Sequence, residues 1–72
     1  MMREQLYRQR SAMNNGGRAS YALKRNADML WTVWRNNVPL QHIEPTPNKP
    51  EARIAALKEA DRLGEIALFD GE

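Results

Sequence analysis

The chain has 72 residues, no cysteine and a formal net charge of +2. This length allows one domain at most, so residues 1–72 are expected to form a single small domain with a modest core of its own. The absence of cysteine excludes disulfides and thiolate metal sites, which leaves helix packing, self-association or a partner as sources of stability. Because no apolar run has the length of a signal peptide or of a membrane span, a cytoplasmic protein without membrane contact is expected.

Charge and aromatic residues are divided unevenly at Val38. Residues 1–37 carry seven Lys or Arg against two acidic residues, whereas residues 38–72 carry four against seven, so the two parts have charges of about +5 and −3. Both tryptophans and both tyrosines precede Val38, and all four prolines follow it. The division predicts a basic helical part over residues 1–37, a proline-rich arm over 38–50, and an acidic helix with a tail over 51–72.

Two helices are predicted in the basic part. Over residues 2–13, Met2, Leu6 and Met13 fall near one face of a short helix, which residues 14–17 (Asn-Asn-Gly-Gly) interrupt. Over residues 18–37, apolar residues recur at steps of three or four and form an arc about half the circumference wide, which predicts a long helix. The members of this arc include Ala19, Leu23, Ala27, Leu30 and Trp34. The helix is expected to end before Pro39, because a residue that precedes proline avoids the α region.

The acidic part begins with an arm and continues as a helix. Four prolines over residues 38–50 favour an extended backbone that runs back along the preceding helix or reaches another molecule. A helix is predicted over residues 49–63, with Pro50 in its first turn, a capping box from Asn48 to Glu51, and Gly64 as its C-terminal stop. The predicted fold class is therefore all-α: two or three helices, the extended arm and a short apolar tail.

Groups for catalysis are scarce in this sequence. His42 is the one histidine, and with Glu44 it forms His-X-Glu, a fragment of zinc deaminase sites whose cysteine-containing partner motif is absent. One histidine with scattered carboxylates is a weak metal site, and Ser11 and Ser20 have no evident base. We therefore expect a protein that is not an enzyme, with no catalytic, cofactor-binding or metal-binding residues.

Protein binding is the favoured function. On the predicted long helix, Trp31 and Trp34 lie one turn apart beside Arg35, and Trp and Arg are enriched at interface hot spots. The alternative for both indoles is the protein's own core, which is favoured for Trp34, whereas Trp31 lies at the edge of the apolar arc. The expected binding residues are these three together with the apolar tail residues Ile66, Leu68 and Phe69.

The tail offers a more specific interpretation. Residues 65–69, Glu-Ile-Ala-Leu-Phe, resemble the peptide of roughly Gln-Leu-Ser/Asp-Leu-Phe with which bacterial replication and repair proteins bind the sliding clamp. Leu68 and Phe69 agree with that motif, and Glu65 replaces its leading glutamine. The resemblance implies a replication or repair accessory protein. The tail is alternatively packed on the chain's own helices or forms a short edge strand open to a partner strand.

Nucleic-acid binding is the second class of function. A basic surface releases counterions from phosphates, and exposed aromatic rings stack on single-stranded bases. The residues expected to form that surface are Arg3, Arg8, Arg10, Arg18, Lys24 and Arg25.

The sequence thus favours a small non-catalytic inhibitor, adaptor or assembly factor that binds a larger protein through helix and arm contacts. A neutralising partner that wraps a basic target with its acidic part, and a homo-oligomer, are further possibilities.

Overall fold

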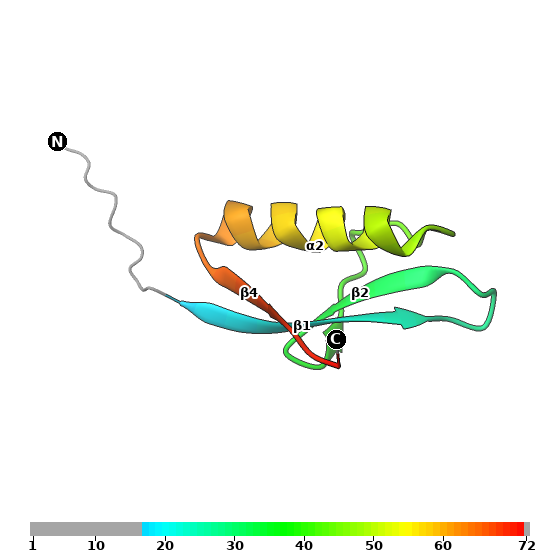
Figure 1. Cartoon of the computed structure of the whole chain (residues 1–72), viewed down its shortest axis with the longest axis horizontal. Coiled ribbons are helices and arrows are strands. Elements are labelled where there is room, and N and C mark those ends of the chain that lie inside the picture. Colours follow the sequence, from blue (N-terminus) through cyan, green and yellow to red (C-terminus); the bar gives the residue numbers. More distant parts are fainter. Residues whose placement is uncertain (1–16, 72) are drawn as a thin grey trace, which may run out of the picture.

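The computed structural model describes residues 17–71, which form an α+β fold of two layers, a four-stranded sheet and one helix (Figure 1). The all-α prediction is therefore wrong, and the predicted helix over residues 2–13 lies outside the described residues. The elements are β1 (Arg18–Arg25), β2 (Trp31–Arg35), β3 (Val38–Pro39), α2 (Lys49–Leu63) and β4 (Ile66–Phe69). The sheet order is β3-β2-β1-β4, in which β1 and β4 are parallel and the other pairs antiparallel.

The segment predicted as the long helix forms the β1–β2 hairpin. Its buried positions alternate, with Ala19 and Tyr21 on β1 and Val33 on β2 directed toward α2. All side chains of β2 except Arg35 are aromatic or β-branched, the types that fit a pleated sheet. At the hairpin tip, the Asn26 side-chain carbonyl accepts hydrogen bonds from the Asp28 and Leu30 amides at 2.9 and 3.0 Å. This local bonding competes with helix formation.

A second, tighter turn joins β2 to β3. Arg35 pairs with Val38, and the two residues between them, Asn36 and Asn37, have φ values of 51° and 66°. Positive φ at both central residues is the signature of a type I′ hairpin turn, which asparagine tolerates better than most residues. The Asn36 side chain also accepts a hydrogen bond from the Ser20 amide at 3.0 Å and so ties the turn to β1.

The predicted arm packs on its own chain. After β3, the Leu40 amide donates to the Val33 carbonyl at 3.0 Å, and Thr46 and Trp31 exchange backbone hydrogen bonds of 2.7 and 3.0 Å. The segment therefore runs back along β2 and completes its outer edge. Leu40 and Ile43 pack against the core cluster.

The predicted helix over residues 49–63 is confirmed as α2, with Pro50 in its first turn. Gly64 stops it in a left-handed conformation with φ 70°, where its amide and that of Glu65 donate to carbonyls of the last turn. The predicted capping box is wrong. The Asn48 side chain makes no capping hydrogen bond, and the Glu51 carboxylate accepts instead from the Thr46 hydroxyl at 2.7 Å.

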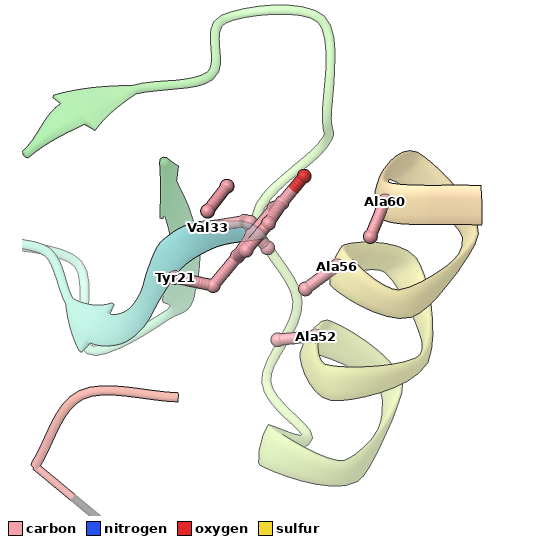
Figure 2. Packing of buried hydrophobic residues seen from close by; sticks show 6 residues of the cluster. Tyr21, Val33, Ala52, Ala56 and Ala60 are labelled. Carbon is pink, nitrogen blue, oxygen red and sulfur yellow. The ribbon is translucent and has the colours of Figure 1, made fainter. Parts of the chain in front are cut away.

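The core lies between α2 and the sheet and is small (Figure 2). Its largest fully buried side chains are Tyr21 and Val33, and α2 contributes only alanines, which lets the helix lie close to the sheet. The buried hydrophobic residues are Ala19, Tyr21, Val33, Ala52, Ala56 and Ala60. Large apolar side chains are left exposed, namely Met29, Val38, Ile54, Leu57, Leu63, Ile66 and Leu68.

Candidate protein-binding site

One face of the sheet has no covering layer in residues 17–71. The helix covers the face that carries Ala19, Tyr21 and Val33, and it is the only helix of this part of the chain (Figure 1). Side chains that alternate with those residues point to the opposite side. We call this side the open face, and it consists of Arg18, Ser20, Ala22, Lys24, Thr32, Trp34, Pro39, Ile66 and Leu68.

The strand register brings these side chains together from four strands. Ala22 is paired with Trp34, which is paired in turn with Pro39. On the other side of β1, Ser20 is opposite Leu68, and Arg18 is opposite Ile66. Ile66 and Leu68 are 57% and 50% exposed, so the β4 side of the open face presents apolar surface directly to solvent.

A chain of polar contacts positions the Trp34 indole on the open face. Its ring N–H donates to the Thr32 hydroxyl at 3.0 Å, and that hydroxyl donates to the Lys24 carbonyl at 2.7 Å. The Lys24 ammonium lies 4.4 Å from the indole ring centroid, a cation–π contact. Trp34 is thus half-buried but held in one orientation, which reduces the entropy lost when a partner orders it.

The two tryptophans lie on opposite faces of β2, because a spacing of three residues puts side chains on opposite sides of a strand. Their predicted position on one helix turn is therefore wrong. Trp31 packs against the core on the helix side, where the Arg25 guanidinium and the Lys49 ammonium lie 5.0 and 5.1 Å from its ring centroid. Trp31 and Trp34 accordingly belong to separate surfaces.

Arg35 also lies on the helix side, in an internal ion pair. Its guanidinium donates two hydrogen bonds to the Glu65 carboxylate, at 2.7 and 2.8 Å, and the hydroxyl of the fully buried Tyr21 donates to the same carboxylate at 2.7 Å. The bonds from Arg35 lower the pKa of Glu65, and burial raises the pKa of Tyr21. This network joins β1 and β2 to the start of β4.

A second buried carboxylate belongs to Glu59 on α2. It accepts hydrogen bonds from Arg62 at 2.8 and 3.2 Å, and His42 lies 3.1 Å away. These bonds, led by those from Arg62, lower the pKa of Glu59 to about 2. His42 therefore connects the arm to the helix.

The predicted tail residues are split between the two faces of the sheet. Ile66 and Leu68 lie on the open face, whereas Phe69 lies on the helix side, where the Arg53 guanidinium is 4.7 Å from its ring centroid and the Tyr21 ring 6.3 Å. Since residues 66–69 form β4 and pair with β1, binding to a sliding clamp as a separate peptide would require β4 to leave the sheet.

The predicted nucleic-acid residues are also divided. Arg18 and Lys24 share the open face, Arg25 lies beside Trp31 on the helix side, and Arg3, Arg8 and Arg10 lie outside the described residues. Four members of the open face are not among the predicted binding residues, namely Ala22, Ser20, Thr32 and Pro39. The alternation of side chains along residues 18–25 was the signal that would have identified the first of these.

Comparisons with known proteins assign no relative, because the chain matches no family model, no curated protein and no solved structure. Within residues 17–71, no three His, Asp or Glu side chains are grouped so as to hold a metal ion, and no pocket is enclosed. The helix in this part of the chain is too short and too polar to span a membrane.

Proposed function

We propose that this chain is a non-catalytic protein-binding module, an inhibitor, adaptor or assembly factor, which binds its partner through the open face. The observation that supports this proposal is the one-sided covering of the sheet, since no other element of residues 17–71 covers the face that carries Trp34, Ile66 and Leu68. Large apolar side chains exposed on one face of a small protein are typical of interaction sites. A cytoplasmic location belongs to the proposal, and cell fractionation would test it.

The composition of the open face indicates the chemistry of the partner that we expect. Its apolar part consists of Ala22, Trp34, Pro39, Ile66 and Leu68, and burying the remaining exposed area of one such large side chain contributes about 1 kcal/mol. The charged strand residues on this face are Arg18 and Lys24, both basic. We therefore expect an apolar partner surface bordered by Asp or Glu, which matches both the apolar centre and the charge.

The test compares Trp34→Thr with Val38→Thr. Both positions are strand residues, but Val38 pairs with Arg35 and points to the helix side. Val38→Thr therefore removes exposed apolar area that does not belong to the open face. A partner captured from the native cells is purified and titrated calorimetrically against each variant. We expect affinity to fall at least about 10-fold for Trp34→Thr, because a central aromatic anchor contributes about 2 kcal/mol or more, and to stay unchanged for Val38→Thr. Equal affinities of the two variants would contradict the proposal.

Single-stranded nucleic acid is a second candidate partner. It is favoured by the Lys24 ammonium over the Trp34 ring, since a cation beside a stacking platform is the usual arrangement for binding bases and phosphates. The same variants are titrated with a labelled oligonucleotide over a salt series. Affinity that falls steeply with salt and is lost in Trp34→Thr supports this candidate. Absence of binding at low salt eliminates it.

A further inference from the structure

The outer edge of β4 presents backbone groups that no strand of the described residues pairs with. The Ile66 amide donates to the Gly17 carbonyl at 2.9 Å, and the Asp70 amide donates to the Tyr21 carbonyl at 2.8 Å, so even-numbered residues bond toward β1. Because backbone groups alternate in direction along a strand, Ala67 and Phe69 direct their N–H and C=O groups outward. No strand of residues 17–71 lies on that side of β4.

The two edges of the sheet differ in how they are protected. The β3 edge consists of two residues, includes Pro39, and is continued along β2 by the contacts of Leu40 and Thr46. β4 reads Ile-Ala-Leu-Phe and has neither a charge nor a proline, two of the devices that prevent a partner strand from adding to an edge. The edge at β4 is therefore competent to pair with another strand.

We propose that a second copy of this chain pairs with β4, with the two β4 strands antiparallel about a twofold axis. The outward groups restrict the register to pairs of odd-numbered residues, and in the register that we favour Ala67 of one copy exchanges both hydrogen bonds with Phe69 of the other. On the helix side, this pairing places the small Ala67 side chain of each copy opposite the large Phe69 side chain of the other. It also places Leu68 opposite Leu68 on the open face, in a close non-hydrogen-bonded pair. In this register the edge is complementary to itself, which favours a second copy as its occupant.

The geometry of the dimer accounts for further exposed apolar surface. A twofold axis perpendicular to the sheet yields eight continuous strands with both helices on the same side. Leu57 lies one turn after Arg53, whose guanidinium is over Phe69, so Leu57 is on the β4 side of α2 and approaches the dimer axis. Leu57 and Leu68 are both among the exposed large apolar residues. Dimer formation is expected to reduce the exposure of Leu57 on the helix side of the sheet and of Leu68 on the open face.

The experiment uses two charge variants of the full chain, Leu68→Glu and Leu68→Lys, measured by light scattering and analytical ultracentrifugation. We expect the wild-type chain to have twice its 8.3 kDa chain mass. Each variant alone is expected to be monomeric, because like charges face each other across the axis. A mixture of the two is expected to form the heterodimer. The controls Val38→Glu and Val38→Lys, exposed on the opposite edge strand, are expected to stay dimeric.

A monomeric wild-type chain up to millimolar concentration would overturn the proposal, as would Leu68 variants that remain dimers or a mixture that does not associate. Hydrogen exchange of the wild-type chain provides a readout without substitution. The amides of Ala67 and Phe69 are expected to become at least about 10-fold more protected as concentration rises through the dimer transition. Protection that is independent of concentration would also overturn it. The partner test with Trp34→Thr leaves β4 unchanged, so the two proposals fail separately.

Discussion

Glu65 connects three elements through one carboxylate, and its replacement tests how much this network stabilises the fold. Glu65→Gln removes the ion pair with Arg35 while retaining the size of the side chain. We expect the free energy of unfolding at pH 7 to fall by about 1–3 kcal/mol, below the cost of breaking a fully buried pair, because the Arg35 side chain is 33% exposed. Urea denaturation measures the change. Tyr21→Phe, which removes one hydrogen bond, should cost about 1 kcal/mol.

The stabilisation by the charge of Glu65 is expected to decrease as the pH is lowered. The pKa of Glu65 is lowered in the folded chain, mainly by the hydrogen bonds from Arg35, relative to its ordinary value of 4.5. The stabilisation by its charge is therefore fully present above pH 4.5 and is lost as the pH falls through the folded-state pKa. The difference in unfolding free energy between the wild-type chain and Glu65→Gln should shrink from pH 6 to pH 3. A difference that stays constant over this range would show that the charge of Glu65 contributes nothing.

At the level of the elements, the type I′ turn at Asn36 and Asn37 offers a stabilising change. Asn37 is held at φ 66°, where a residue with a Cβ is disfavoured, and Asn-Gly is the preferred pair for this turn. Asn37→Gly is expected to raise the free energy of unfolding by about 0.5 kcal/mol, because the lost strain exceeds the added entropy of the unfolded chain. Thermal and urea denaturation measure it. Asn36→Gly is the matched control: it loses the hydrogen bond from the Ser20 amide and should not stabilise.

The sequence predicts α2 correctly and the β1–β2 hairpin wrongly, for a physical reason. The helix begins and ends at local signals, Pro50 and Gly64, which act wherever the rest of the chain lies. Residues four apart, such as Ala19 and Leu23, share a face in a helix and also in a strand, so their spacing does not distinguish the two. The signals that distinguish strand from helix here are the alternation of polar and apolar residues up to Tyr21 and the asparagines at both turns.

The sequence predicts only part of the candidate site. Residue type predicts Trp34, Ile66 and Leu68 as binding residues, which stays a prediction, and the structure places all three on the open face. Trp31 lies on the other face because residues three apart in a strand point to opposite sides, which a helical spacing does not reveal. The open face depends on the parallel pairing of β1 with β4, which joins residues more than 40 positions apart in the sequence. A local periodicity contains no information about such a pairing, so the neighbours of Ile66 and Leu68 had to come from the structure.

For the molecule as a whole, the separation of its two layers is set by the alanines of α2. Ala56 is fully buried above Tyr21 and Val33, with Ala52 and Ala60 one turn away on either side (Figure 2). Ala56→Leu adds three carbon atoms where the layers are in contact, so the helix must lift from the sheet or neighbouring side chains must leave their rotamers. We expect the free energy of unfolding to fall by about 1–3 kcal/mol in urea denaturation.

Ile54→Ala provides the control on the same helix. Ile54 is 53% exposed on the outer side, so its truncation should change the free energy of unfolding by no more than about 0.5 kcal/mol. If Ala56→Leu changed the free energy of unfolding as little as Ile54→Ala, the space between the helix and the sheet would accommodate a larger side chain. Close packing at the alanines would then not limit the stability. If Ala56→Leu alone destabilises, close contact across the alanines limits how large the side chains between the helix and the sheet can be.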